Sequence, residues 1–192
     1  MSDRIDAQVD FLREADRLKS ILRASRLIDN SRHENSAEHS WHVMLYAAVL
    51  GEHAGPDVRI DRVLRMLLIH DIVEIDAGDA PIHGHVDHEA MAAKEAAAAT
   101  RLFGLLPADQ GADYLALWQE FEAAESVDAQ FAKAIDRFQT PVANLASGGG
   151  TWTDYNVTMD QMETRVGSPV KRGAPGLWAW MRPRLVAWFA RA

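Results

Sequence analysis

The sequence has 192 residues, 48% of them hydrophobic, and a formal net charge of −8 at pH 7. This length supports one well-buried core, and because no shift in composition divides the chain we expect a single domain over residues 1–192. The acidic balance argues against a surface that binds duplex nucleic acid, and the absence of cysteine excludes disulfides, thiolate metal ligands and a cysteine nucleophile.

The N-terminus is charged and has no apolar signal segment. No run approaches the ~20 apolar residues of a membrane span. A chain without cysteine also fits a reducing compartment. We therefore expect a protein that is not exported, does not enter a membrane and works in the cytoplasm.

The first third of the chain predicts two helices joined by a loop. Apolar residues at spacings of three to six indicate an amphipathic helix that ends near residue 24. Residues 29–35 are rich in turn formers and predict a loop. Ser36 has the character of an N-cap, which places His39 at the third helical position. The helix that follows, to about His53, is apolar on nearly every side, which is typical of the middle of a bundle.

An apolar run at residues 63–69 ends in two ionisable residues, His70 and Asp71, and Glu74 follows. On a continuous helix Glu74 falls between the other two in angle, so all three side chains can face one point. A divalent cation there would compensate for burying these groups. The alternative is a hydrogen-bonded core histidine with acids at a solvated helix end.

A break at Gly78 and Pro81 introduces a loop that contains His83, His85 and His88. Three histidines this close together can form a metal-binding tract. Gly84 and the loop setting make a mobile, solvated lid or a helix entry an equally good interpretation of the same residues.

Three helices are predicted next, over residues 87–103, from about 114 to 125, and from about 127 to 145. Asp136 lies beside the apolar stripe of the last of these, where an acid commonly pairs with a neighbour such as Lys133. This pairing is the alternative to a functional role for Asp136.

The C-terminal part predicts a flexible loop and two further helical segments. The loop, residues 147–151, lacks the strand and the Lys-Ser/Thr sequence of a P-loop. Thr158 and Gln161 resemble a capping box that opens a helix to about Val166. The tryptophan-rich segment 177–189 is expected to close the core or to form a subunit interface. No segment has convincing strand periodicity, so we expect an all-α fold of about seven to nine helices.

His39, the pair His70-Asp71 and Asp136 occupy three predicted helices in the order His, His-Asp, Asp. With its surrounding motifs, the sequence resembles the HD-domain superfamily of metal-dependent phosphohydrolases, and within it the 5'-deoxynucleotidase-like branch. The matching stretches are residues 34–39, residues 67–74 with Gly78 and Asp79, and residues 131–136. The resemblance implies an HD-domain helical bundle with a metal-binding core at about residues 34–140, on which the helices of residues 158–192 pack.

The resemblance also implies the chemistry of the site. It assigns metal ligation to His39, His70, Asp71 and Asp136. Two imidazoles and two carboxylates suit one divalent ion such as Mn, Co, Fe, Ni or Zn. Glu74 would orient or deprotonate the attacking water, and Asp79 would contact the substrate or protonate the leaving oxygen, although a plain turn role also fits Asp79. The implied reaction is hydrolysis of (deoxy)nucleoside 5'-monophosphates.

One departure from the branch concerns phosphate binding. Its members carry an Arg-Trp pair upstream of the first ligand histidine, where this chain has Ala24-Ser25 flanked by Arg23 and Arg26. Either arginine can bind phosphate through its bidentate guanidinium. We therefore expect one of them to bind the substrate.

Two other functions fit parts of the pattern. The first is a two-metal phosphodiesterase or oxygenase that holds its second ion on His83, His85 or His88. The second is a non-catalytic, ligand-sensing module in which the metal is a structural staple. For the leading hypothesis the partner is a small phosphorylated molecule such as a nucleotide, and the tryptophan-rich C-terminus suggests a homodimer.

Overall fold

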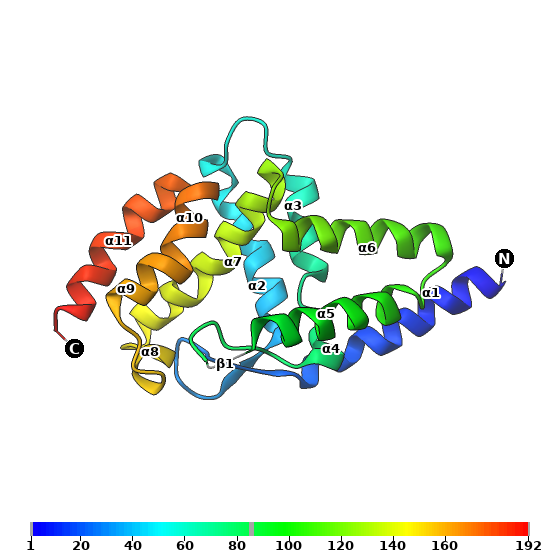
Figure 1. The fold of residues 1–192 in the computed structure, drawn as a ribbon, viewed down its shortest axis with the longest axis horizontal. Coiled ribbons are helices and arrows are strands. Elements are labelled where there is room, and N and C mark those ends of the chain that lie inside the picture. The colour runs from blue at the N-terminus through cyan, green and yellow to red at the C-terminus, as the bar shows by residue number, and fades with distance from the viewer. Residues whose placement is uncertain (1, 85–86, 192) are drawn as a thin grey trace.

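The computed structural model describes residues 2–84 and 87–191, most of which are helical (Figure 1). The expectation of an all-α fold is confirmed. The α-helices are α1 (Ser2–Ala15), α2 (Ser36–Leu50), α3 (Ile60–Ile69), α4 (Glu74–Ala77), α5 (His88–Phe103), α6 (Ala108–Ala123), α7 (Val127–Ala146), α8 (Thr151–Asp154), α9 (Met159–Met162), α10 (Ser168–Gly173) and α11 (Pro175–Phe189). Shorter helical segments are η1 (Asp16–Ser20), η2 (Gly51–His53) and η3 (Glu163–Gly167).

A small hairpin interrupts the helical pattern and corrects two predictions. The first helix ends at Ala15 rather than near residue 24, and residues 29–35 are only partly a loop. Strand β1 (Leu22–Arg26) pairs antiparallel with β2 (His33–Asn35) through an irregular register. The turn between them is closed by Asp29, whose Oδ1 accepts a hydrogen bond of 2.9 Å from the Ser31 amide. Strands of three and five residues are too short to show a period of two in the sequence.

Helix α2 begins one residue earlier than expected, because its N-cap is Asn35 and not Ser36. The Asn35 side chain accepts a hydrogen bond from the Glu38 amide, and the Glu38 carboxylate accepts one from the Asn35 amide, which completes a capping box. His39 and Val43 are fully buried on one face. On the opposite face Trp41 is 60% exposed, so the prediction that α2 is enclosed on all sides is wrong for that face.

The helix expected to run through His70 and Glu74 is broken. Helix α3 ends at Ile69, and residues 70–73 form a tight turn with bonds from the Ile72 amide to the Ile69 carbonyl and from the Glu74 amide to the Asp71 carbonyl. Helix α4 then ends at Gly78, whose φ of +78° favours glycine. The turn explains how His70, Asp71 and Glu74 face one region without a continuous helix.

Helix α7 crosses the middle of the molecule and packs against α2, α3, α6, α10 and α11 (Figure 1). Its apolar stripe is fully buried, as Phe131 and Ile135 show. Helix α10 approaches it most closely: a Cβ added to Gly173 would lie 2.0 Å from the carbonyl oxygen of Gln130. This contact fixes α7 against the C-terminal helices, and α7 carries Asp136.

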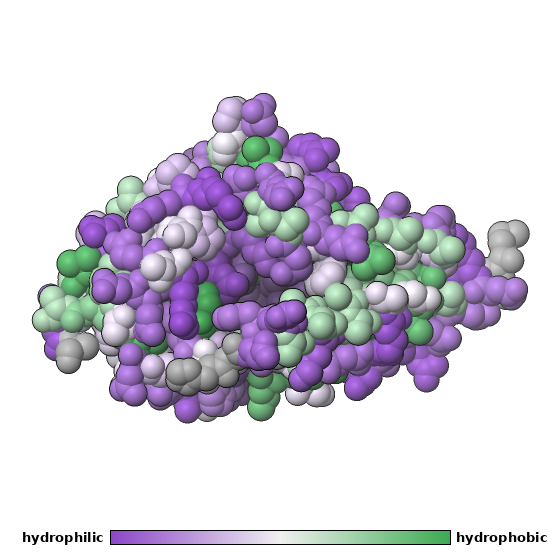
Figure 2. Space-filling view, viewed as in Figure 1, coloured by the Kyte–Doolittle hydropathy of each residue, from purple (hydrophilic) through white to green (hydrophobic). Residues whose placement is uncertain are grey.

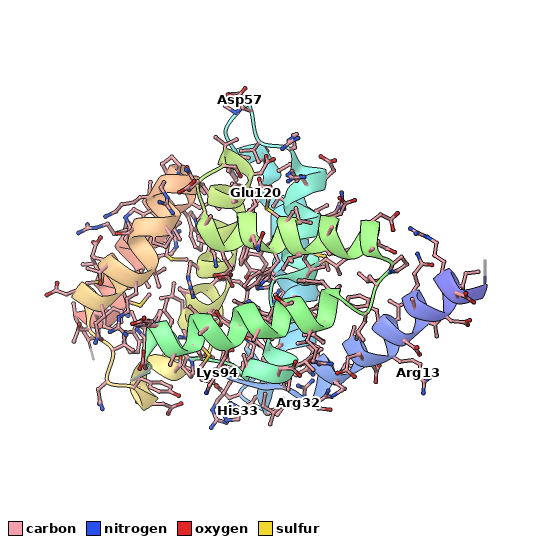
Figure 3. All side chains as sticks on the ribbon, turned by 45° about the vertical axis from the view of Figure 1, so that its right-hand side comes forward. Arg13, Arg32, His33, Asp57, Lys94 and Glu120 are labelled. Atoms are coloured by element: carbon pink, nitrogen blue, oxygen red, sulfur yellow. The ribbon has the colours of Figure 1, made fainter. Side chains whose placement is uncertain are left out.

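The exterior is charged and polar over much of its area. Arg13 of α1 and Asp57 of the loop between α2 and α3 point outward in Figure 3. Among the described residues, no helix combines the length and the apolar character needed to cross a bilayer.

Asp128 joins the start of α3 to the start of α7. Its Oδ1 accepts a hydrogen bond of 2.7 Å from the Arg59 amide at the N-terminus of α3, and its Oδ2 accepts bonds from the Arg59 guanidinium at 2.6 and 2.9 Å. Asp128 is 1% exposed. Because α3 leads to His70 and α7 carries Asp136, this cap helps to set the distance between the two.

We expect Asp128→Ala to lower the free energy of unfolding by about 2 kcal/mol, since it removes a helix cap and leaves a backbone N–H without its acceptor. Urea denaturation would measure the change. Asp113→Ala, at an exposed site on α6, is the matched control and should change stability by less than about 0.5 kcal/mol. Equal effects of the two substitutions would contradict the role given to Asp128.

Candidate metal and substrate site

Three side chains of the types that can bind a metal ion come from different parts of the chain and meet in the core. His39 comes from α2, His70 follows α3, and Asp136 comes from α7. Their ligand atoms lie within 4.8 Å of one another. His39 Nε2 is 3.0 Å from Asp136 Oδ1, and His70 Nε2 is 3.7 Å from the same oxygen. Both histidines are buried.

Asp71 adjoins this group through both carboxylate oxygens. Its Oδ1 is 3.0 Å from His70 Nε2, and its Oδ2 is 4.0 Å from His39 Nε2. The structure thus brings the four residues predicted as metal ligands into one place. The alternative partner for Asp136, Lys133, instead contacts Glu122 at 2.9 Å.

The hydrogen bonds of His70 fit a metal ligand. Its Nδ1 is 2.9 Å from the Leu67 carbonyl oxygen, which requires the proton to be on Nδ1. Its Nε2 is buried and has no hydrogen-bond partner. An imidazole fixed by a backbone carbonyl on one nitrogen and free on the other is the usual arrangement of a metal-binding histidine. The donor set suits a divalent ion.

The charges of the site favour a protonated His39, at the place where a metal cation would bind. Burial and Arg23 lower the pKa of His39, but Asp136, Glu34 and Asp71 outweigh them and raise it to about 9. Burial alone would raise the pKa of Asp136, but Arg137 and the two histidines hold it well below its ordinary value. The buried carboxylates are therefore stabilised by positive charge at their centre.

Arg23 on β1 lies among the acids of the site. Its Nη1 is 3.0 Å from Asp71 Oδ2 and 3.7 Å from both Glu74 Oε1 and Asp79 Oδ1. The Ala24 amide donates a hydrogen bond of 3.1 Å to Asp79 Oδ2. The predicted residues Arg23, Glu74 and Asp79 are therefore together beside the histidines.

Arg26, the other predicted phosphate ligand, lies elsewhere. It lines a separate groove with Trp41 and His42. A different arginine, Arg137, takes a place at the site: its Nε is 3.8 Å from Asp136 Oδ2. Sequence reasoning missed Arg137, although its position next to Asp136 was a usable signal.

Glu74 is 8% exposed and is held by a hydrogen bond that Ser36 Oγ donates to its Oε2. Burial and the neighbouring Asp71 raise the pKa of Glu74 to about 9. Burial also raises the pKa of Asp79. Glu74 can thus carry a proton near neutral pH, and Asp79 holds its proton more strongly than an ordinary aspartate, which suits acid–base chemistry.

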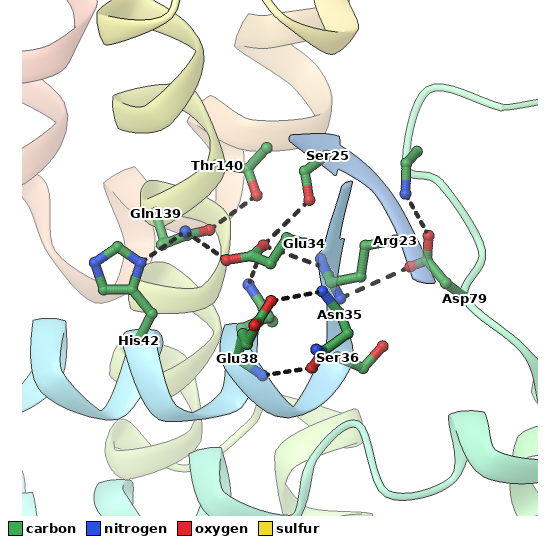
Figure 4. A network of polar contacts seen from close by, with 12 residues as sticks. Arg23, Ser25, Glu34, Asn35, Ser36, Glu38, His42, Asp79, Gln139 and Thr140 are labelled. Carbon is green, nitrogen blue, oxygen red and sulfur yellow. Dashed lines mark hydrogen bonds and ion pairs between the residues drawn. The ribbon is translucent and has the colours of Figure 1, made fainter. Parts of the chain in front are cut away.

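Sequence reasoning also did not predict the network of polar contacts around Glu34 (Figure 4). Glu34 Oε2 is 3.6 Å from His39 Nδ1 and accepts a hydrogen bond of 3.2 Å from Ser25 Oγ. Gln139 Nε2 donates a bond of 3.4 Å to Glu34 Oε1. Glu34 opens the 34–39 motif, but only the hairpin shows that it faces the ligand histidine.

Two cavities share the lining residues Arg23, Asp79, Asp136 and Arg137, and one of them is also lined by His70 and Asp71. Figure 2 shows a hollow with many hydrophilic residues on this face of the molecule. His83 lines one cavity and His88 the other, whereas His85 lies outside the described residues. Within the described ranges, neither His83 nor His88 belongs to a second cluster of three metal-binding side chains.

We expect Arg23→Gln to destabilise the metal-free protein by about 3 kcal/mol at pH 8 and by less at pH 5. Arg23 is among the groups that lower the pKa of Glu34, and it opposes the rise in the pKa of Asp79. Without Arg23 both folded-state pKa values rise, so the folded variant binds more protons than the folded wild type and its deficit grows as pH rises. Urea denaturation in chelator measures it, and a deficit independent of pH would contradict the assignment.

The sequence and the structure are both similar to those of known proteins. The HD domain family model matches residues 15–178. The 5'-deoxynucleotidase HDDC2 of Homo sapiens is 28% identical over 130 residues, and that of Bos taurus is 30% identical over 131 residues. Each alignment covers 67% of this chain and 62% of the relative, so the match spans less than two thirds of those proteins.

Two solved structures are also similar. A predicted metal-dependent phosphohydrolase from Magnetospirillum magnetotacticum MS-1 is 48% identical with a TM-score of 0.94, over 98% of this chain and 94% of that one. A conserved hypothetical protein from Pyrococcus furiosus has a TM-score of 0.59 at 21% identity, over 91% of this chain and 99% of that one. The second supports the fold alone.

Proposed function

Because this chain belongs to the HD domain family, we propose that it is a metal-dependent phosphohydrolase that releases phosphate from (deoxy)nucleoside 5'-monophosphates. The observation that carries the proposal is the meeting of His39, His70 and Asp136 beside a cavity that His70 and Asp136 line together with two arginines. The names of the HDDC2 relatives and of the Magnetospirillum protein support the same reaction class.

His39, His70, Asp71 and Asp136 are the residues that would hold one divalent ion. Once bound, a cation of this kind polarises a phosphoryl group and makes a water molecule more acidic. The Nε2 of His70, which makes no hydrogen bond and faces the carboxylates of Asp71 and Asp136, and the low pKa of Asp136 support this assignment. Which of Mn, Co, Fe, Ni or Zn is bound is a matter for metal analysis.

Glu74 accepts the proton of the attacking water at Oε1, the oxygen to which Ser36 does not donate. Its raised pKa makes the Glu74 carboxylate a stronger base than an ordinary one, and a cation bound beside it would favour the ionised form that can accept a proton. Asp79 is fixed at Oδ2 by the Ala24 amide. Its Oδ1 contacts the substrate or gives a proton to the leaving oxygen, which the raised pKa of Asp79 favours.

Arg23 and Arg137 supply the positive charge for the phosphate. Arg23 is the predicted phosphate ligand that lies at the cavity, and Arg26 is not assigned this role because it lines another groove. Arg137 has 35% of its side chain exposed and lies near a single carboxylate at 3.8 Å. Its guanidinium is therefore freer than that of Arg23 to bind a phosphate oxygen.

We also propose that residues 1–192 act as one domain in the cytoplasm, as a homodimer. The support for a homodimer is exposed apolar surface. Trp41, Leu45 and Val49 form an exposed stripe on α2, and Trp180 of α11 is 45% exposed. No observation on the described residues favours the two-metal or ligand-sensing alternatives.

The proposed activity is tested by stripping the metal, adding back Mn, Co, Ni or Zn singly, and measuring phosphate release from deoxy- and ribonucleoside monophosphates, triphosphates and sugar phosphates. We expect metal-dependent release from monophosphates, reduced at least about 100-fold in Asp71→Ala, because a ligand and its negative charge are lost. Circular dichroism establishes that the variant is folded. Absence of release from every substrate by metal-loaded, folded protein would reject the function.

Glu34 provides a test of the metal site that does not depend on turnover. We expect Glu34→Gln to weaken Mn or Ni binding about 10- to 100-fold, because Glu34 is the carboxylate that faces Nδ1 of His39. Isothermal titration calorimetry measures the affinity. Glu38→Gln is the matched control, since Glu38 pairs with Arg32 at the surface. The role of Glu34 would be refuted by equal affinities in the two variants.

A further inference from the structure

One of the two cavities is lined by two kinds of side chain, which we take as its charged end and its apolar end. At one end are the charged side chains of the metal-binding and phosphate-binding residues Arg23, Asp79, Asp136 and Arg137. Arg23 and Arg137 give this end two guanidinium groups that can bind an anionic part of a ligand.

The other end is mainly apolar and aromatic. It is lined by Pro81 and Ile82 of one loop, by Trp152 and Tyr155 in and after α8, and by Val166 of η3. Trp152 is 2% exposed and packs against Trp188 and Phe189 at ring-centroid distances of 5.0 and 5.2 Å. Tyr155 is 38% exposed. The lining therefore includes a tryptophan that is held in place by aromatic packing and a tyrosine that a ligand can reach.

The loop of this apolar end is anchored and carries one unpaired polar group. Arg165 donates a hydrogen bond of 2.7 Å to the Ile82 carbonyl oxygen, which joins the loop to η3. His83 Nδ1 is buried and has no hydrogen-bond partner. Burial, with the charges of Arg165 and Arg137, lowers the pKa of His83 to about 4, so the ring is neutral at physiological pH and presents one donor and one acceptor.

We propose that this end of the cavity binds the nucleobase of a nucleoside 5'-monophosphate, with the ring of Tyr155 against the base and His83 Nδ1 in a hydrogen bond with its edge. The proposal rests on the proposed function, which places the phosphate at the charged end. A sugar phosphate is polar throughout and would leave the walls formed by Ile82, Trp152 and Tyr155 without apolar contact. A base supplies a flat apolar ring with polar edges, which matches these walls.

The test compares two substrates of the metal-loaded enzyme, dAMP and 2-deoxyribose 5-phosphate, which differ in the presence of the base. The measured quantity is the ratio of kcat/KM for dAMP to that for the sugar phosphate. We expect Tyr155→Ala and His83→Ala each to lower this ratio about tenfold, as loss of a stacking or edge contact does. Tyr155→Phe keeps the ring, and Trp41→Ala removes an exposed aromatic residue outside this cavity, so both should keep the ratio within about twofold.

A second measurement separates this inference from the proposed function. Saturation-transfer NMR of deoxyadenosine with metal-free protein reports on base binding without hydrolysis, and we expect its signal to fall in Tyr155→Ala. Loss of this signal supports the base subsite even where no phosphate is released. An unchanged ratio in both Tyr155→Ala and His83→Ala, or hydrolysis of sugar phosphates in preference to nucleotides, would overturn it.

Discussion

The ion pairing of Arg23 with buried carboxylates is the interaction on which the site depends. Asp71, Glu74 and Asp79 each lie within 3.7 Å of its Nη1, and Glu34 lies 3.7 Å from its Nε. Carboxylates this close repel one another in a low dielectric and would stay protonated without a cation. Arg23 compensates part of this negative charge. A divalent ion and the guanidinium of Arg137 can compensate the rest.

The fold brings this charge into the core through a hairpin of few residues. Strand β1 carries Arg23, and β2 leads directly into the capping box of α2 and so to His39. Helix α7 supplies both Asp136 and Gln139, and the latter reaches Glu34 behind His39. A hairpin and a central helix thus hold opposite sides of one set of polar groups, while the surrounding helices bury it.

Sequence reasoning located most of the long helices, the cap at Thr158 and the residues that meet at the site, because apolar periodicity and the order His, His-Asp, Asp are local signals. It missed the hairpin, because its strands are too short to show a pattern. It could not choose between Arg23 and Arg26, since neighbouring arginines on one strand differ only in the side of the strand that they occupy. Arg137 had one local signal, its position next to Asp136, whereas the contact of Glu34 with His39 depends on the hairpin and on tertiary packing.

Because α10 approaches α7 closely, a substitution at Gly173 can affect the candidate metal site, although this residue is far from the site motifs in the sequence. Gly173 lies beyond the last metal-binding motif, yet any side chain there would press on the backbone of α7 at Gln130. Helix α7 is one rigid body that also bears Asp136, so the strain would be transmitted along it. During evolution, a change at Gly173 would therefore be selected against as though it were a change in the metal site itself.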